Sequence, residues 1–255
     1  MFRSGLAALV VAAAACAGAL LPVPPVEAPT HRAAVQAPAA PEPLAGKVIV
    51  IDPGHQLGNA RFPSEINRLV PAGGFRKPCN TTGASTNNGY PEATFTWQVA
   101  RLLQSRLTGL GAKVVLTRTS NRLDRWGPCV DVRGRRGNAL GADLKISLHG
   151  DGSYAGGPGF HVITPPRDRA ARRLALDVRA GLHARRLPYA GYIAGGDGLD
   201  VRGDLGTLNL SAMPAVMVEL GNMRSAADAR RMTTPRGRSS YAAGLTRGIR
   251  VFLAR

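Results

Sequence analysis

The sequence predicts a single α/β domain built on an open, mostly parallel, twisted sheet with helices on both faces. Short runs rich in β-branched residues alternate along the chain with longer segments of helical periodicity, which is typical of parallel sheets. The candidate domain, residues 46–255, has about 210 residues, enough for one sizeable core and too few for two ordinary domains. The apolar fraction of 44% also favours a globular domain.

Five short apolar runs are the predicted strands. The first of them ends at Pro53-Gly54, as expected for a buried parallel strand that runs into a loop. The predicted strands are Lys47–Asp52, Ala112–Thr117, Asp143–His149, Phe160–Thr164 and Ala215–Leu220.

Four segments are predicted to be helices. Pro91 suits a first helical turn, and Gly109 and Gly111 end the helix that it begins. That helix should bury Phe95, Val99, Leu102, Leu103 and Leu107, which recur at three- and four-residue steps. The other helices are expected over Asp131–Leu140, over Asp168–Arg186 with Leu174, Val178 and Leu182 inward, and over Ser239–Leu253 with Leu245, Ile249 and Phe252 inward.

Two long connections rich in glycine show little periodicity, Gln56–Tyr90 and Pro188–Pro214. Connections of this length in a small domain are usually functional or pinned in place. Cys79 offers such an anchor for the first of them.

The N-terminus is expected to direct export. Residues 1–28 have a positive start at Arg3 and an apolar run over Leu6–Leu21, the order typical of a secretory signal peptide. A membrane anchor is the alternative, but a run of about 16 residues is shorter than the roughly 20 needed to span a bilayer. Residues 29–45 form a Pro/Ala-rich linker. We therefore expect a periplasmic, wall-associated or extracellular protein.

Export changes the expected state of the cysteines. Signal cleavage after Ala19 or after Ala28 would remove Cys16, for which lipid attachment is the alternative fate. Cys79 and Cys129 would then remain in an oxidising compartment, where two cysteines most often pair. The predicted disulfide closes a loop of about 50 residues and should stabilise the fold by a few kcal/mol. A thiolate metal site is disfavoured, because neither cysteine has a CxxC partner or a nearby histidine.

The formal net charge of +17 indicates an anionic partner. The acidic polymers of a bacterial wall fit this charge. Nucleic acid is not expected, because the basic residues are scattered and aromatic residues make up only 5% of the chain. No coiled coil or dimer stripe is present in the sequence, so we expect a monomer.

Four polar residues are expected to meet at one edge of the sheet. His55 follows the first strand, His149 ends the third and Glu219 closes the last, while Glu92 begins the first helix. Two imidazoles and a carboxylate form a zinc ligand set of the catalytic type, with a fourth position open for water. Glu219 would then carry a proton from that water to the leaving group. Each residue alone also has an ordinary structural explanation, so the prediction depends on their convergence.

Several sequence motifs occur along the chain in this order: VIDPGH, PEATFTWQVARLL, TRT, an R-x4-N at Arg133 to Asn138, ADLKISLHGDGS and MPAVMVELGNM. Together they resemble the zinc-dependent N-acetylmuramoyl-L-alanine amidases of the Amidase_3 family, especially its small actinobacterial members, over about residues 47–255. The resemblance implies hydrolysis of the amide bond between N-acetylmuramic acid and the L-alanine of peptidoglycan.

The same resemblance implies roles for individual residues. His55, Glu92 and His149 match the ligands of the family's zinc ion, one Zn²⁺ per chain, and Glu219 matches its catalytic glutamate. The sequence departs from many members at Gly150-Asp151 and at Gly221-Asn222, without touching a ligand. Only Asp151–Gly159 lies before the next strand, too short for the inhibitory helix of some members, so we expect activity without an activator.

Two other functions remain open from sequence. One is a zinc peptidase that cuts elsewhere in the stem peptide, and the other is a non-enzymatic wall-binding module. In the second long loop Arg202, Asp204 and Asn209 are candidates for a substrate groove. Asp52 could orient a metal ligand, although anchoring a loop is the simpler interpretation. His161 and His183 are interpreted as structural or exposed.

Overall fold

Six strands form one sheet in the order β4-β1-β5-β8-β6-β7. The computed structural model describes residues 42–255, so the expected signal peptide, most of the linker and Cys16 lie outside the described residues. All neighbouring strands are parallel except β6 and β8, which confirms the mostly parallel sheet. The strands are β1 (Val48–Pro53), β4 (Lys113–Leu116), β5 (Leu144–Asp151), β6 (His161–Thr164), β7 (Leu199–Val201) and β8 (Ala215–Asn222).

The two faces of the central strands differ in chemistry. Successive side chains of a strand point to opposite faces, so alternate positions share one face. The first face is apolar and belongs to the main core, with Ile49, Ile51, Leu144, Ile146, Leu148, Val216, Val218 and Leu220. The alternating positions of the same strands carry Val50, Asp52, Lys145, Ser147, His149, Met217 and Glu219. The second face is therefore the polar face of the sheet.

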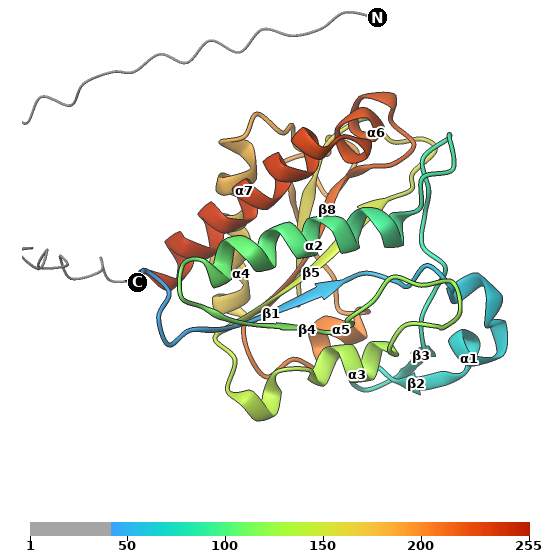
Figure 1. Cartoon of the computed structure of the whole chain (residues 1–255), viewed down its shortest axis with the longest axis horizontal. Helices are drawn as coiled ribbons and strands as arrows, with labels where there is room; N and C mark the ends of the chain where they lie inside the picture. The colour runs from blue at the N-terminus through green and yellow to red at the C-terminus, as the bar shows by residue number, and fades with distance from the viewer. Residues whose placement is uncertain (1–41) are drawn as a thin grey trace, which may run out of the picture. The chain divides into compact units, whose positions relative to one another are not determined.

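Helices cover both faces, as predicted (Figure 1). On the apolar face, α7 (Pro235–Leu253) packs against both α2 (Glu92–Thr108) and α4 (Arg169–His183). On the polar face, α3 (Val130–Arg135) contacts α5 (Gly206–Asn209). Within residues 42–255, no helix has the length and apolar character needed to cross a membrane.

The helix predicted over Asp131–Leu140 is wrong in its second half. The α-helix ends at Arg135, and a separate 3₁₀ turn covers Asn138–Leu140. Between them Gly137 has φ 98°, a left-handed conformation that cannot continue a helix and that glycine adopts readily. A side chain at Gly137 would also meet Val50 Cγ2 at 2.4 Å, so the backbone lies close against the sheet.

Other differences concern short elements and exposure. The first long connection contains α1 (Pro63–Asn67) and the antiparallel hairpin of β2 (Leu69–Pro71) and β3 (Arg76–Pro78). The helix α6 (Ala226–Thr233) was not predicted from the sequence, and α7 begins four residues before the predicted start. The prediction that Leu102 is buried is wrong: its side chain is 36% exposed, because it lies at the solvent edge of the apolar stripe of α2.

Glycines bring α4 and α7 into close contact. A Cβ atom added at Gly181 would lie 2.3 Å from the carbonyl oxygen of Gly244 and 2.8 Å from the amide nitrogen of Gly248. The distance between packed helices depends on the side chains at the contact, so residues without side chains allow the closest approach. This contact joins two of the three helices that cover the apolar face.

Replacement of Gly181→Ala should lower the free energy of unfolding by about 1–3 kcal/mol, because the added methyl group must displace backbone atoms. The gain in helix propensity of about 1 kcal/mol only partly offsets this loss. Urea unfolding measures the difference. In the control Gly191→Ala the added Cβ has no neighbour within 4 Å, so its stability should change little. Equal stability of the Gly181 variant and the wild type would contradict the tight contact.

Candidate metal centre and catalytic site

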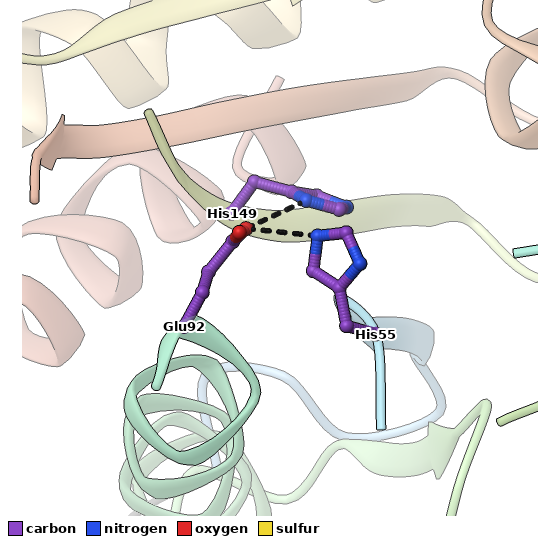
Figure 2. A group of neighbouring side chains, drawn as sticks. All are labelled: His55, Glu92 and His149. Atoms are coloured by element: carbon purple, nitrogen blue, oxygen red, sulfur yellow. Dashed lines mark hydrogen bonds and ion pairs between the residues drawn. The ribbon is translucent and has the colours of Figure 1, made fainter. Parts of the chain in front are cut away.

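Three side chains converge beyond the carboxyl ends of β1 and β5, at the start of α2 (Figure 2). Glu92 Oε1 lies 3.1 Å from His55 Nε2 and 3.0 Å from His149 Nδ1. The ligand atoms that the three residues offer lie within 4.8 Å of one another. All three residues are buried, with 8% or less of their surface exposed. The structure therefore brings together the three residues that the sequence selected as metal ligands.

The backbone at this corner is adapted to the close approach of two imidazoles. His55 has φ 58°, a left-handed conformation that is uncommon for residues other than glycine and that often marks functional sites. A Cβ atom at Gly54 would lie 2.5–2.8 Å from ring atoms of His149. The two rings meet edge to face, with their centroids 4.9 Å apart. A side chain at Gly54 would therefore displace His149.

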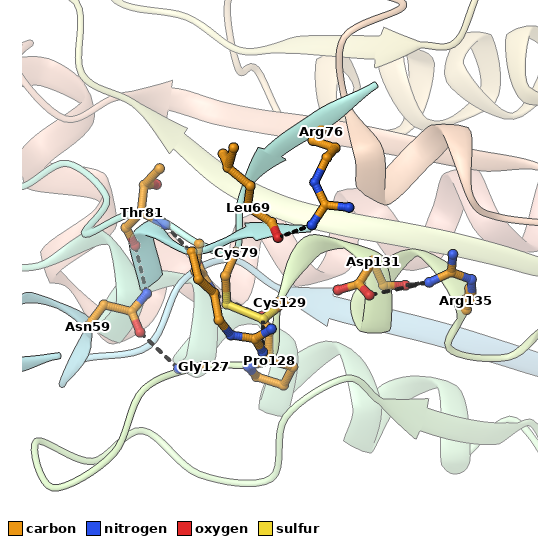
Figure 3. The surroundings of a disulfide bond; sticks show 12 residues. Asn59, Leu69, Arg76, Cys79, Thr81, Gly127, Pro128, Cys129, Asp131 and Arg135 are labelled. Carbon is orange, nitrogen blue, oxygen red and sulfur yellow. Dashed lines mark hydrogen bonds and ion pairs between the residues drawn. A yellow bond between two sulfur atoms is a disulfide. The ribbon is translucent and has the colours of Figure 1, made fainter. Parts of the chain in front are cut away.

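The first long connection is pinned beside the site by the predicted disulfide between Cys79 and Cys129, which the structure confirms (Figure 3). Asn59 reinforces it: its Nδ2 donates to the carbonyl oxygen of Thr81 at 2.6 Å, and its Oδ1 accepts from the amide of Gly127 at 2.8 Å. The covalent bond and these hydrogen bonds place Thr81 directly against the metal-ligand candidates.

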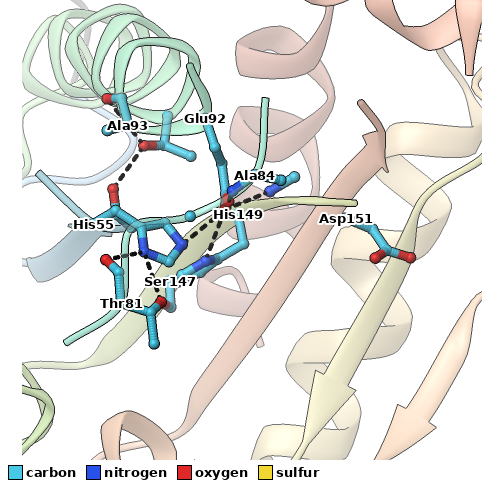
Figure 4. A network of polar contacts seen from close by, with 12 residues as sticks. His55, Thr81, Ala84, Glu92, Ala93, Ser147, His149 and Asp151 are labelled. Carbon is cyan, nitrogen blue, oxygen red and sulfur yellow. Dashed lines mark hydrogen bonds and ion pairs between the residues drawn. The ribbon is translucent and has the colours of Figure 1, made fainter. Parts of the chain in front are cut away.

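Thr81 sets the proton position on His55 (Figure 4). His55 Nδ1 lies 3.0 Å from the Thr81 carbonyl oxygen, which can only accept, so we assign the ring hydrogen to Nδ1. The lone pair of Nε2 then faces the carboxylate of Glu92 at 3.1 Å. Two electron-pair donors at this separation repel each other unless a proton or a metal ion lies between them. The donor set therefore fits a metal ion.

Glu92 is oriented by backbone amides. Its Oε2 accepts from the amide of Ala84 at 2.7 Å, and its Oε1 accepts from the amide of Gly150 at 3.0 Å. Burial raises the pKa of this carboxyl, but the nearby His55 and His149 outweigh burial and hold it well below its ordinary value. Glu92 is thus kept as a carboxylate. Zinc in proteins takes nitrogen and oxygen ligands at about 2.0–2.2 Å, and tetrahedral ligands then lie roughly 3.3–3.6 Å apart, close to the 3.0 and 3.1 Å between Glu92 Oε1 and the two imidazole nitrogens.

A buried ion pair lies beneath His149 on the polar face. Arg133 donates through Nε and Nη2 to the two carboxylate oxygens of Asp52, at 2.8 and 2.9 Å. The hydroxyls of Ser147 and Thr117 also donate to Asp52, each at 2.6 Å. Burial alone would raise the pKa of Asp52, but Arg133 and these hydroxyls hold it far below its usual range. Arg133 Nη2 also lies 3.3 Å from His149 Nε2, so the pair packs against the ring of a metal-ligand candidate.

Arg118, another residue of the family motifs, has a structural role that was not predicted from the sequence. Arg118 is buried and donates to the carbonyl oxygens of Pro53 at 3.1 Å and Ala93 at 2.8 Å. It therefore ties the end of β1 to the first turn of α2, the segments that carry His55 and Glu92. The only sequence signal for Arg118 was its place in the word TRT.

Glu219 lies beside His149 in the same row of the sheet. His149 on β5 and His161 on β6 are both register partners of Glu219 on β8, so the three side chains share the polar face. Glu219 Oε2 is enclosed and has no hydrogen-bond partner among the described residues. Burial, followed by the charges of Glu92 and Asp151, raises the pKa of Glu219 well above its ordinary value. These properties suit a group that accepts and returns a proton.

A cavity of about 320 Å³ joins these residues, a size typical of sites for small ligands. Its walls include the three metal-ligand candidates, Glu219 and Arg202. The segment of residues 152–160, between β5 and β6, contains no helix.

The other proposed groove residues stand next to the cavity wall. Asp204 forms two hydrogen bonds with Arg202. Asn209 Nδ2 donates to the carbonyl oxygens of Ala72 and Gly203, which joins the hairpin connection to the second long loop.

The two remaining histidines of residues 42–255 are not among the metal-ligand candidates. His161 is buried within β6. His183 is exposed at the end of α4, where its ring stacks on Tyr189 with the centroids 4.7 Å apart.

The fold and the site together indicate an α/β enzyme with a candidate metal centre at the carboxyl end of its sheet. Comparison with protein families gives the particular family: residues 49–251 match Amidase_3, described as N-acetylmuramoyl-L-alanine amidase, and the chain belongs to this family. The family and the enzyme class predicted from the sequence are thereby confirmed.

The relatives include mycobacterial proteins, as the resemblance to small actinobacterial members predicted. An N-acetylmuramoyl-L-alanine amidase of Mycobacterium tuberculosis is 44% identical over 225 residues, which cover 86% of this chain and 91% of the relative. The solved structure of the apo form of the amidase Ami1 from Mycobacterium abscessus is 42% identical, with a TM-score of 0.78, and covers 82% of this chain and 100% of that chain. The Ami1 amidase of Mycobacterium smegmatis is 37% identical with a TM-score of 0.77, over 83% of this chain and 98% of that chain.

Replacement of Arg133→Met should lower the free energy of unfolding by about 3–5 kcal/mol, because Asp52 would stay buried without its counter-charge. Asp52 has a lowered pKa when folded, so its contribution is present above about pH 4 and is lost as the pH falls. The control Arg135→Met breaks an exposed pair with Asp131 and should cost less than about 1 kcal/mol. Urea unfolding with a chelator present makes the comparison, and equal losses in the two variants would contradict it.

Proposed function

We propose that this protein hydrolyses the amide bond between N-acetylmuramic acid and L-alanine in peptidoglycan, and that the reaction requires one zinc ion held by His55, Glu92 and His149. The observation that carries the proposal is the convergence of these three buried side chains beside Glu219, in one cavity. Relatives at 44% and 42% identity bear the name of this amidase activity. Peptidoglycan lies outside the cytoplasmic membrane, so the proposal agrees with the export expected from residues 1–28.

The chain's own atoms define where the metal would be held. His55 Nε2, Glu92 Oε1 and His149 Nδ1 face one another, and the contacts of Thr81, Ala84 and Gly150 fix two of the three ligand residues in orientation. When bound, zinc polarises the scissile carbonyl and makes a neighbouring water more acidic. Three protein ligands leave a position for the reacting groups.

Glu219 moves the proton. Its carboxylate takes a proton from the attacking water as the new C–O bond forms, and it delivers this proton to the nitrogen of L-alanine as the C–N bond breaks. The products are a free carboxylate on the muramic acid and a peptide with a free amino group.

Replacement of Glu219→Gln should lower kcat/KM by about 10²–10⁴-fold, because the amide can neither accept nor return the proton. The bound zinc, measured by atomic absorption, should remain near one per chain. The matched variant His55→Ala should lose both zinc and activity. A Glu219 variant with wild-type turnover of a defined muropeptide would remove Glu219 from the proposed mechanism.

Removal of zinc with a chelator should abolish hydrolysis, and addition of one equivalent of Zn²⁺ should restore it. The same treatment should lower the Tm, because a ligand that binds only the folded state stabilises it. Mass spectrometry of the products identifies the bond: an intact stem peptide with a free L-alanine amino group is expected. A shortened peptide would indicate a zinc peptidase, and full activity after complete zinc removal would exclude the metal from the mechanism.

A further inference from the structure

Besides Arg133, which is paired with Asp52, two cationic side chains line the same cavity as the candidate metal ligands. Lys77 comes from the hairpin strand β3, and Arg202 follows β7 in the second long loop. Both are partly exposed, Lys77 by 34% and Arg202 by 43% of the side chain. The fold therefore brings two positive charges from distant segments to one wall of the site.

Asp204 holds both cations in place. Arg202 donates to its two carboxylate oxygens, through Nε at 2.9 Å and Nη2 at 2.8 Å. Lys77 Nζ donates to the Asp204 carbonyl oxygen at 2.8 Å and lies 3.4 Å from Oδ2. The hydrogen bonds from Arg202 lower the pKa of Asp204 to about 2, so Asp204 is a carboxylate at neutral pH. Two cations and one anion leave this wall with a net positive charge.

Arg202 also keeps hydrogen-bonding capacity. Its Nη1 has no partner among the described residues, although Nε and Nη2 are both used. Leu205 lines the cavity beside it, so a ligand there would be partly removed from water. A guanidinium fixed in one plane next to an apolar surface is well suited to bind a carboxylate through charge-assisted hydrogen bonds.

The other acidic groups of the cavity have roles elsewhere. Glu92 faces the two imidazoles, and Glu219 lies beside His149. Asp151 accepts the hydroxyl of Tyr192 at 2.8 Å. The pKa of Arg202 is raised mainly by its hydrogen bonds with Asp204, and the charges of Asp200 and Glu219 add to this effect; Asp200 does not line the cavity. The Lys77–Arg202 wall is thus the part of the cavity that can receive an anion.

We infer that Lys77 and Arg202 form a subsite for the free carboxylate of the second residue of the stem peptide. This inference rests on the proposed amidase function. When the second residue is bonded to the third through its side-chain carboxyl, its α-carboxylate stays free. This α-carboxylate is the first free carboxylate along the peptide after the scissile nitrogen. Two residue steps of about 3.8 Å bring it within roughly 8 Å of that nitrogen. A carboxamide at this position has no charge and only one acceptor oxygen, so it would lose most of the attraction to the cations.

Two forms of one substrate test the subsite. Each is an N-acetylmuramoyl-L-alanyl-D-glutamyl peptide whose glutamate is linked onward through its side-chain carboxyl. The α-group of this glutamate is a free carboxylate in one form and a carboxamide in the other. The wild type should prefer the carboxylate by about tenfold in kcat/KM, chiefly through a lower KM, which corresponds to about 1.4 kcal/mol. In Arg202→Gln this preference should fall to about one, and Lys77→Gln should lose part of it.

Arg122→Gln is the matched control. Arg122 forms the same two-point pair with an aspartate two residues further on, Asp124, but it does not line the cavity. This variant should keep the wild-type preference. Asp204→Asn provides a second test if Arg202→Gln does not fold, because it retains Arg202 but loosens it, and the preference should decrease.

Two results would overturn the subsite: an equal kcat/KM for both substrates in the wild type, or an unchanged preference in Arg202→Gln and Asp204→Asn. Either result leaves hydrolysis itself in place and so contradicts the subsite alone. A wild type that cleaves neither substrate at the muramoyl–alanine bond would overturn the amidase proposal and the subsite together.

Discussion

The buried pair of Asp52 and Arg133 is the interaction on which the polar half of this structure depends. It lies on the face of the sheet opposite the main core, where Asp52 also receives two hydroxyl donors from neighbouring strands. Lys145 on the same face extends the arrangement: its ammonium donates to the carbonyl of Arg133 at 2.9 Å, and burial lowers its pKa to about 8. A fully satisfied polar network of this kind fixes one arrangement of strands and helix. His149 is positioned on that network.

The surroundings of two carboxyl groups in the site shift their pKa values in opposite directions. Glu92 receives backbone amides and imidazoles, which stabilise its charge. Glu219 is enclosed and lies near other negative charges, which stabilise its protonated form. Opposed pKa shifts in one site are a recognised means of dividing roles between similar groups. Here the division matches what the proposed reaction needs, a permanent ligand and a proton carrier.

The mostly parallel sheet and five of its six strands were predictable to within a few residues, because each of the five is a local apolar run; β7 lies in a segment that was expected to be a loop. The polar network around Asp52 was less predictable from the sequence. Asp52 and Arg133 lie far apart in the sequence, and their pairing appears only once α3 packs on the polar face. The break at Gly137 depends on the approach of its backbone to Val50, a tertiary constraint absent from helical periodicity. Arg118 joins two segments through backbone carbonyls, which no side-chain pattern reveals.

The strand order has a consequence for biosynthesis. The last strand of the sheet, β8, does not add to an edge; it lies between β5 and β6 in the middle. A nascent chain that has emerged only as far as β7 contains His55, Glu92 and His149 but has not yet made Glu219. Long-range strand pairing of this type forms late and cooperatively. A partly synthesised chain therefore lacks the proposed proton carrier, which joins the candidate metal ligands only when β8 completes the sheet.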